Sequence, residues 1–408
     1  MKKTFQIHTL GCKVNQYDSQ CIRERFQQAG FKQAGSGVRA GVSIINTCTV
    51  TASADRKSRN MIRRVIHANP RGRIIVTGCL AKKKETALSG IKGIDYIIGK
   101  RFFGDGISDF RDRTRAFLKI QDGCDNFCSY CKVPAVRGPS RSRDIKTIIR
   151  EALILSEKGF QEIVLTGICL GAYGKDLSPR LSLAVLINDL EKIPGLKRLR
   201  LSSIEASDIS GALIAQMNGA RKLCPHLHIP MQSGDDDILR LMRRKYRRSD
   251  YLRIVDEITD SIPGAAVTTD ILVGFPGETE AQFNNTVGLI EKIRPLRTHI
   301  FPYSPREGTF AFTLGSTAGP DTLQRRIGKL KKTAEACAKE FRKCFIDKIV
   351  YVLFENRSKQ NPVFWEGYAE NYIKVLAAST ECLENTIKPV LLTGIQGTYM
   401  LGRPLKDN

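Results

Sequence analysis

The first third of the chain alternates short apolar runs with amphipathic segments. Runs of β type lie at residues 5–11, 43–47 and 73–78, and the segments at about 15–30 and 53–68 carry apolar residues at helical spacing. Strands that alternate with helices need crossover connections, so this order predicts a parallel sheet.

Each of these three runs leads into a cysteine, namely Cys12, Cys48 and Cys79. The carboxyl ends of parallel strands lie along one edge of a sheet, so we expect the three thiols to converge there. Free cysteine is a favoured buried residue, which would explain one or two of them but not three in the same structural place. The pattern therefore predicts a three-thiolate metal site.

The same alternation continues from Ala116 to Tyr303. Six βα units predict a partial, open β/α barrel with its site at the carboxyl ends of the strands. The segment from Thr279 to Gln282 has the form of a capping box and marks the start of a helix. We expect strands at 117–121, 162–166, 197–202, 226–230, 266–273 and 297–302, and helices at about 144–158, 181–192, 207–219, 249–261 and 279–293.

A long helix is expected at about residues 321–347. Its single apolar stripe includes Cys337 and Cys344, which we therefore interpret as core residues and not as ligands. Residues 349–405 are rich in short β patterns and turn signals, which favours a small β-barrel. The expected fold class is α/β, with domains at residues 1–113, 114–348 and 349–408.

Composition narrows the class of protein. A chain of 408 residues with 42% hydrophobic content is long enough for two or three domains, each with its own core. Twelve cysteines in a chain of this length indicate metal ligation and buried thiols in a reducing compartment, so we expect a cytoplasmic protein. The N-terminal residues lack a signal-peptide core, and no run approaches the ~18 apolar residues of a membrane helix, so we expect no membrane partner.

Charge indicates a polyanionic partner. Lys and Arg total 65 against 41 Asp and Glu, a formal net charge of +24, and RNA or DNA is the obvious candidate. A solvated basic face is the alternative for each local run. Tyr368 and Tyr372 near the C-terminus suit a stacking surface, whereas we expect Trp365 in the core. The densest basic runs are Arg56, Lys57, Arg59, Arg63 and Arg64, and Arg243, Arg244, Lys245, Arg247 and Arg248.

The most specific motif is CxxxCxxC, formed by Cys124, Cys128 and Cys131. Three thiolates can hold three irons of a four-iron cluster and leave the fourth iron open for chemistry. A zinc ribbon is the alternative, but a closed structural zinc site needs four ligands, and no fourth Cys or His follows at a suitable distance. The motif resembles the signature of radical S-adenosylmethionine enzymes.

Over its whole length the chain resembles the methylthiotransferases, radical S-adenosylmethionine enzymes that insert sulfur and add a methyl group. The resemblance implies two 4Fe-4S clusters, an auxiliary one on Cys12, Cys48 and Cys79 and the radical one on the central motif. It also implies S-adenosyl-L-methionine as radical source and methyl donor, a sulfur donor, and an electron donor such as flavodoxin or ferredoxin. The run from Glu366 to Val375 is similar to the RNA-binding TRAM domain, which implies a five-stranded barrel and tRNA as partner.

Four short sequence segments resemble those of the subgroup that modifies C2 of N6-threonylcarbamoyladenosine beside the tRNA anticodon. They are Leu10 to Tyr17, Asn46 to Thr51, Cys224 to Pro230, and Phe301 to Ser304. A threonyl carboxylate needs a cationic or hydrogen-bonding partner, for which Lys13, Arg137, Arg141 and Arg143 flank the two cluster loops.

Further site residues follow from position and resemblance. Tyr130 resembles the aromatic position near the adenine of the cofactor, although loop packing explains it equally well. Two departures from the family pattern, Cys169 and Ala206, touch no cluster position. Residues at strand ends that face the same mouth are candidates for cofactor contacts: Thr166, Gly167, Ser203, Glu205 and Gln232.

Three alternatives stay open at this point. The enzyme could act on isopentenyladenosine tRNA or on a ribosomal-protein aspartate. Only the four segments that resemble the threonylcarbamoyladenosine subgroup and the net positive charge of the chain argue against these substrates. A non-catalytic iron-sulfur RNA-binding protein would keep the six cysteines and the barrel, but the open coordination position on both triads argues against it.

Overall fold

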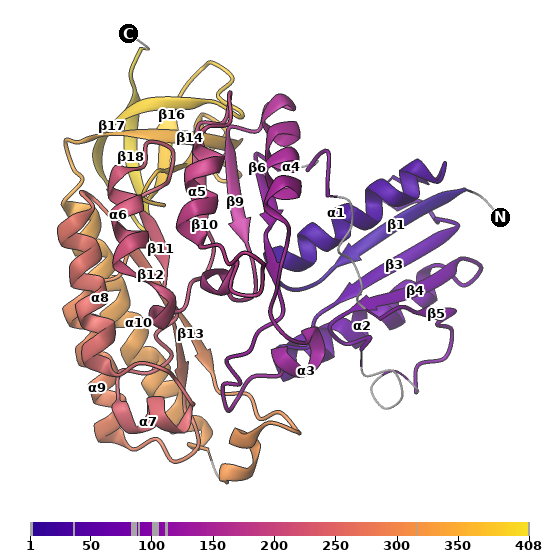
Figure 1. Cartoon of the computed structure of the whole chain (residues 1–408), viewed down its shortest axis with the longest axis horizontal. Coiled ribbons are helices and arrows are strands. Elements are labelled where there is room, and N and C mark those ends of the chain that lie inside the picture. Colours follow the sequence, from indigo (N-terminus) through magenta and orange to yellow (C-terminus); the bar gives the residue numbers. More distant parts are fainter. Residues whose placement is uncertain are drawn as a thin grey trace.

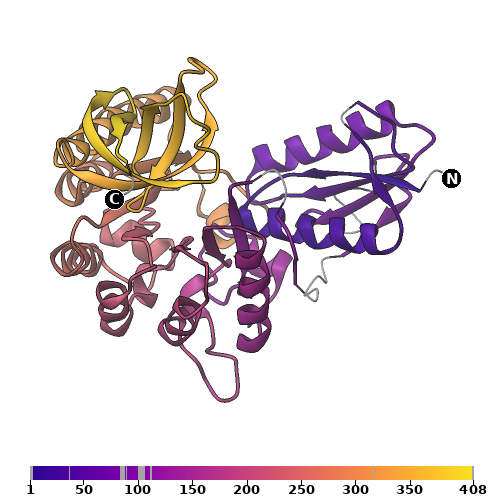
Figure 2. The ribbon, with the colours of Figure 1, turned by 90° about the horizontal axis from the view of Figure 1, so that it is seen from above.

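The computed structural model describes residues 3–35, 37–82, 88, 90–99, 106–110, 113–315 and 317–406. Three parts follow one another along the chain (Figure 1). The N-terminal part and the C-terminal barrel lie on different sides of the central part in both views (Figures 1 and 2).

The N-terminal part is a five-stranded parallel sheet in the order β2-β1-β3-β4-β5. Helices α1 (Lys13–Gln28) and α2 (Ala52–Ala68) cover opposite faces of it (Figure 2). All six residues of β3 are buried, as expected for a central strand covered on both faces. The strands are β1 (Thr4–Thr9), β2 (Lys32–Gln33), β3 (Val42–Thr47), β4 (Arg73–Gly78) and β5 (Tyr96–Ile97).

The central part is an arc of six parallel strands. Strands β6 (Arg115–Lys119), β9 (Glu162–Thr166) and β10 (Arg198–Leu201) pair as one sheet. Strands β11 (His226–His228), β12 (Ala266–Val273) and β13 (Arg297–Pro302) pair as another. Single parallel bridges, Leu199 to Leu223 and Ser203 to His228, join the two sheets. The predicted partial barrel is therefore confirmed, with an interrupted ladder between β10 and β11.

Helices on the outside of the arc bury apolar faces against it, and their bounds agree with the predicted ones within a few residues. They are α4 (Ile145–Glu157), α5 (Leu183–Glu191), α6 (Gly211–Gly219), α8 (Arg248–Ser261) and α9 (Glu280–Ile293). The predicted capping box is present at α9, where Thr279 and Gln282 bond each other's backbone N–H groups. Short elements were not predicted: α3 (Val133–Arg137), the two-residue pair β7 (Gln121–Asp122) and β8 (Arg141–Ser142), and α7 (Asp236–Leu241).

Helix α10 (Pro320–Lys343) packs beside β13 and α9, and Cys337 is buried in its stripe as predicted. The prediction that Cys344 is a core residue is wrong, because this thiol is exposed. The helix ends at Lys343, and helical spacing no longer governs the C-cap residue that follows it.

The C-terminal part is a closed five-stranded barrel, as predicted, with strand order β14-β15-β16-β18-β17. Its core contains Trp365, which is 4% exposed, so the core assignment of that residue is confirmed. Its strands are β14 (Ile349–Arg357), β15 (Phe364–Ala369), β16 (Lys374–Ala378), β17 (Ile387–Gln396) and β18 (Tyr399–Pro404). Among the described helices, none combines the length and apolar character that a membrane crossing requires.

Candidate active site

The CxxxCxxC loop leaves β6 through a turn that only glycine can make. Gly123 has φ +75°, and a Cβ on it would lie 1.8 Å from the carbonyl oxygen of Pro139. A side chain here would therefore displace the backbone that flanks the loop.

Each sulfur of this loop accepts a hydrogen bond. The donors are the backbone N–H of Asn126 to Cys124 (3.5 Å), the Arg244 guanidinium to Cys128 (3.4 Å), and the backbone N–H of Val133 to Cys131 (3.4 Å). Such donors stabilise ligating thiolates and tune an iron-sulfur cluster. The three residues therefore fit the cluster that their spacing implies.

A fourth sulfur lies beside the loop, which the sequence did not indicate. Cys169 hydrogen bonds Cys124, and this bond lowers the pKa of Cys124 and raises that of Cys169. The Asp208 carboxylate accepts from the Cys169 thiol at 3.5 Å and further holds the proton on it. The arrangement is thus three candidate thiolate ligands with one neighbouring thiol.

Gln121 braces the loop, a role that sequence reasoning missed. Its amide nitrogen donates to the carbonyl of Gly123 (2.8 Å) and to the Ser140 hydroxyl (2.9 Å). Its amide oxygen accepts from the backbone N–H groups of Ile168 (3.0 Å) and Cys169 (2.9 Å). One side chain therefore ties the motif loop to the carboxyl end of β9.

The predicted cofactor contacts fall into two groups. Thr166, Gly167 and Ser203 line the cavity described below. Glu205 and Tyr130 instead gather around Arg244, which pairs with the Glu205 carboxylate and lies 3.4 Å from the Tyr130 hydroxyl oxygen. The remaining candidate, Gln232, has a left-handed backbone (φ +66°) and donates its N–H to the Asp270 carbonyl at 2.8 Å.

Arg244 was predicted to face phosphates, and the structure corrects that expectation. Its side chain is only 4% exposed, because the guanidinium is bound inside the loop by Glu205 and Cys128. Arg243, Lys245 and Arg247 of the same run are exposed.

The second cysteine triad assembles at the edge of the N-terminal sheet. Cys12 is the N-cap of α1, and Cys48 and Cys79 follow β3 and β4. Gly78, with φ +92°, lets these strand ends approach, since its Cβ would lie 2.4 Å from the Thr47 carbonyl oxygen. Burial raises the pKa of Cys48, and the thiols of Cys79 and Cys12 lie close enough to raise it further. Ligation to a cationic cluster would offset both effects, so the triad fits a metal site.

A buried polar chain connects the two triads. Arg137 donates to the Asn15 side-chain oxygen (2.6 Å) and to Asp122 (2.7 Å), and it lies 3.9 Å from the Cys12 sulfur. Lys119 pairs with Asp18 (2.6 Å) and with Asp122 (3.4 Å). These contacts hold the α1 terminus against the loop that begins at Asp122.

A cavity of about 590 Å³ is lined by Cys12 of the N-terminal triad and by Val133, which lies two residues after Cys131. Its wall combines Cys12 and Lys13 with the inward faces of the barrel strands, and Tyr372 of the C-terminal barrel reaches into it. The further lining residues used below are Arg200, His226, His228, Thr268, Asp270, Arg297 and His299. Alternate residues of β11, β12 and β13 supply most of them, as the period of a strand requires.

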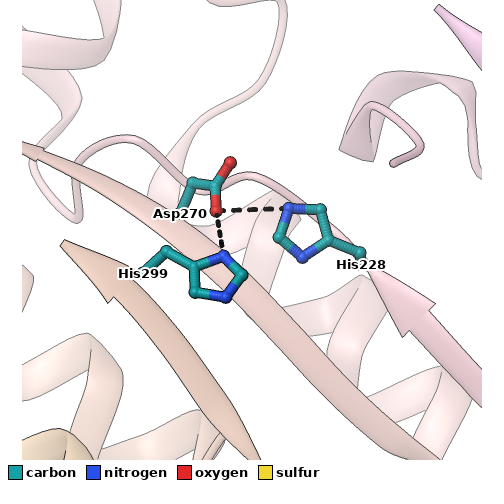
Figure 3. Close-up of side chains that lie close together, drawn as sticks. All are labelled: His228, Asp270 and His299. Atoms are coloured by element: carbon teal, nitrogen blue, oxygen red, sulfur yellow. Dashed lines mark hydrogen bonds and ion pairs between the residues drawn. The ribbon is translucent and has the colours of Figure 1, made fainter. Parts of the chain in front are cut away.

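Three of these side chains point toward one another (Figure 3). One oxygen of Asp270 lies 3.2 Å from the Nε2 of His228 and 3.0 Å from the Nδ1 of His299. Burial alone would raise the pKa of Asp270, but these bonds lower it to about 2. The three ligand atoms lie within 4.8 Å of one another, and they are the one such group among the residues that the structure describes.

Other predicted site residues lie elsewhere. Arg143 pairs with Glu151 (2.6 Å) and contacts Tyr17, so its charge is used in the core between α1 and α4. Tyr368 stacks on Tyr372 at 4.9 Å, and both are half-buried against the central part, not displayed as an open stacking surface.

Comparisons with known proteins agree with this geometry. Residues 4–99 match the family described as Uncharacterized protein family UPF0004, and residues 118–290 match the Radical SAM superfamily. The chain is 38% identical to the threonylcarbamoyladenosine tRNA methylthiotransferase MtaB of Bacillus subtilis (strain 168), over 93% of this chain and 91% of that protein. It is 34% identical to the tRNA-2-methylthio-N(6)-dimethylallyladenosine synthase of Acetivibrio thermocellus, over 90% of this chain and 83% of that protein.

A solved structure shares the fold. The radical S-adenosylmethionine methyltransferase TsrM from Kitasatospora setae superposes with a TM-score of 0.55, at 12% identity, over 76% of this chain and 77% of that chain.

Proposed function

Because the chain belongs to the radical S-adenosylmethionine methylthiotransferase family, we propose that it methylthiolates C2 of N6-threonylcarbamoyladenosine in tRNA. The observation that carries the proposal is a cavity that borders both cysteine loops, since it is lined by Cys12 of the N-terminal triad and by Val133, two residues after Cys131. A base bound there would lie beside the loops that we propose hold the two clusters.

The proposed division of labour follows from this placement. Cys124, Cys128 and Cys131 would hold the radical 4Fe-4S cluster, and the N-terminal triad would hold the auxiliary one. When bound, these groups and S-adenosylmethionine supply the electron, the radical, the sulfur and the methyl group. The domains that we propose are residues 1–113 for the auxiliary cluster, 114–348 for the radical chemistry and 349–408 as a TRAM domain.

The chain's own residues position the reactants. Gly123 and Gln121 set the course of the motif loop, and Arg137 fixes it relative to α1. Tyr372, whose ring lies beneath the guanidinium groups of Arg200 and Arg297, is part of the cavity wall. The protein thus contributes orientation of the reactants.

The choice of modified adenosine rests on two supports. The first is the identity, which is 38% to the threonylcarbamoyladenosine enzymes of Bacillus subtilis and Thermotoga maritima and 31–35% to four dimethylallyladenosine synthases. The second is the group of cationic and histidine side chains in a cavity whose lining is otherwise largely apolar, because a threonyl carboxylate needs cationic or hydrogen-bonding partners.

Mass spectrometry of tRNA nucleosides from cells with and without this gene tests the proposal. We expect the methylthio derivative of threonylcarbamoyladenosine to disappear from the deletion strain and to return with the gene. Loss of the methylthio derivative of isopentenyladenosine instead would contradict the substrate and leave the family reaction intact.

A further inference from the structure

Two cations of the cavity wall, Lys13 and Arg297, are paired with no carboxylate among the residues that the structure describes. Within the described residues, neither Lys13 nor Arg297 makes an ion pair or a side-chain hydrogen bond, although both line the cavity. Arg200, their cationic neighbour, is already bound by Glu162 at 2.7 Å. Among the described lining residues the one acidic side chain is Asp270, and two histidines engage it.

Half-buried cations without a counter-charge favour an anionic ligand. Lys13 and Arg297 are both partly buried, and both line the cavity together with Arg200. A carboxylate bound there would regain in hydrogen bonds what desolvation costs these groups.

A second polar group lies on the same wall. The register of the sheet sets Thr268 beside His228 and Arg297, and Asp270 beside His299. Hydrogen bonds run from His226 through the Thr268 hydroxyl (3.0 Å) to His228 (2.9 Å), and from His228 through Asp270 to His299 (Figure 3).

Two histidines of this hydrogen-bonded series, His226 and His299, are available to a ligand. His226 is 3% exposed, and within the described residues its Nδ1 makes no hydrogen bond. His299 is the last residue of the hydrogen-bonded series. It lines the cavity, and 45% of its side chain is exposed. Buried polar atoms are rarely left unpaired, so a polar ligand is expected beside them.

The threonylcarbamoyl substituent has the matching chemistry, because it carries one carboxylate and one hydroxyl. We propose that this wall is the subsite for that substituent, with its carboxylate between Lys13 and Arg297 and its hydroxyl against His299. The inference rests on the proposed function, because it names what the same cavity recognises.

A metal ion is the competing occupant of the His228, Asp270 and His299 group. Both histidines already face the same carboxylate oxygen through ring nitrogens, and the other nitrogen of His228 is bonded to Thr268. Side chains that are already hydrogen bonded in this way suit recognition of a hydroxyl. A metal ion could bind them only if these hydrogen bonds were broken.

The subsite also explains discrimination. An isopentenyl group would leave Lys13 and Arg297 desolvated and without a counter-charge, and unpaired charged groups reject an analogue more strongly than a lost apolar contact does. Selectivity would thus come from the penalty for the wrong substituent as well as from affinity for the right one.

The test measures binding of one tRNA in two forms to the reconstituted holoenzyme. The tRNA carries either threonylcarbamoyladenosine or unmodified adenosine at the same position, so the phosphates are identical. Arg297→Gln should weaken binding of the modified form by about 10- to 100-fold, the value of a charged hydrogen bond, and leave the unmodified form unchanged. Arg297→Lys should restore part of the difference.

Two further variants keep the result interpretable. His299→Phe alters a half-exposed side chain and should also weaken only the modified form. Arg253→Gln, an exposed arginine of α8 outside the cavity, should change neither. Iron content and thermal midpoint should match the wild type in every variant, because none of the changed residues belongs to either cysteine triad.

The outcomes separate the possible errors. Equal losses on both tRNAs would overturn the inference and assign Arg297 to backbone phosphates, and no loss on either would overturn it outright. A divalent ion retained by the wild type beyond cluster iron, and lost in His299→Phe, would assign the group to a metal. If the wild type fails to methylthiolate threonylcarbamoyladenosine at all, the proposed function is wrong; if it succeeds and the variants bind normally, only the subsite is wrong.

Discussion

At the scale of single residues, the six cysteines of the two triads carry the predicted cluster chemistry. The two cysteine triads are set by loops that begin at strand ends, and each sulfur of the CxxxCxxC loop accepts an N–H hydrogen bond. This makes the roles of the two triads separable by substitution.

Anaerobically reconstituted protein should contain about eight irons, four for each triad. Changing Cys124, Cys128 and Cys131 to Ala should halve the iron and abolish reductive cofactor cleavage, because no open iron remains for S-adenosylmethionine. Changing Cys12, Cys48 and Cys79 should halve the iron but spare some cleavage, and Cys344→Ala, an exposed cysteine, should change neither. Complete loss of cleavage in the second triple variant, with the central part folded, would contradict this division.

Glu162 is a buried carboxylate surrounded by three arginines. The carboxylate is fully buried and lies 2.7 Å from Arg200, 3.7 Å from Arg198 and 3.8 Å from Arg115. Burial by itself raises its pKa, but Arg200 and Arg115 lower the pKa to about 2.

Glu162→Gln should therefore destabilise the protein by about 3–5 kcal/mol, the cost of leaving buried charges unpaired. A depressed folded-state pKa gives stability that is present above the unfolded value near 4.5 and lost as the pH falls toward 2. The difference in thermal midpoint between variant and wild type should thus be constant from about pH 5 to 8. Glu157→Gln, the same change at an exposed position, is the control, and a comparable loss there would refute the assignment.

At the scale of elements, local signals placed the helices well because capping and periodicity are local interactions. The capping box of α9 is an example, with the Thr279 hydroxyl accepting from the Gln282 N–H at 3.3 Å. The prediction for Cys344 is wrong because the apolar spacing in the sequence continues to Cys344, whereas the helix ends at Lys343.

Thr279→Ala should cost about 1 kcal/mol through the lost cap. The expected drop in thermal midpoint is about 2 °C, followed by circular dichroism. Thr259→Ala, within α8 and away from its start, should be neutral or slightly stabilising because alanine has the higher helix propensity. Equal losses in both variants would show that the cap contributes nothing specific.

For the whole molecule, the C-terminal barrel is part of the central fold and not only an appendage. Arg198 donates to the carbonyl of Tyr351 at 2.6 Å, and Arg200 donates to that of Glu370 at 2.8 Å. The similarity of this part to an RNA-binding domain by itself predicts that removing residues from 349 onward weakens tRNA binding more than cofactor cleavage. The structure argues against that selectivity, because the deletion would strip buried arginines of their acceptors.

Salt dependence in the full chain is the better test of tRNA binding. The logarithm of affinity should fall by roughly 0.7–0.9 for each tenfold rise in salt and each phosphate neutralised. Changing the exposed Arg63 and Arg64 of α2 to Gln should lower this slope by about one for each lost phosphate contact, as measured by fluorescence anisotropy. A slope unchanged from the wild type would remove α2 from the tRNA-binding surface.

The sequence by itself determined the strands, the helices, the small barrel and both cysteine triads. These features depend on periodicity along the chain and on thiols fixed at strand ends, so neighbours in sequence suffice to predict them. It also predicted that Thr166, Gly167 and Ser203 face one mouth, because the carboxyl ends of parallel strands share one edge, and these three residues line a single cavity.

Only the tertiary structure decided which polar groups meet. His228, Asp270 and Arg297 come from three strands and are brought together by the register of β11, β12 and β13, which no local pattern specifies. Arg143 and Arg244 looked available from sequence, yet Glu151 and Glu205 bind them. Pairing between distant charges depends on packing across elements, and it leaves Lys13 and Arg297 as the cations that face the cavity without an ion pair among the described residues.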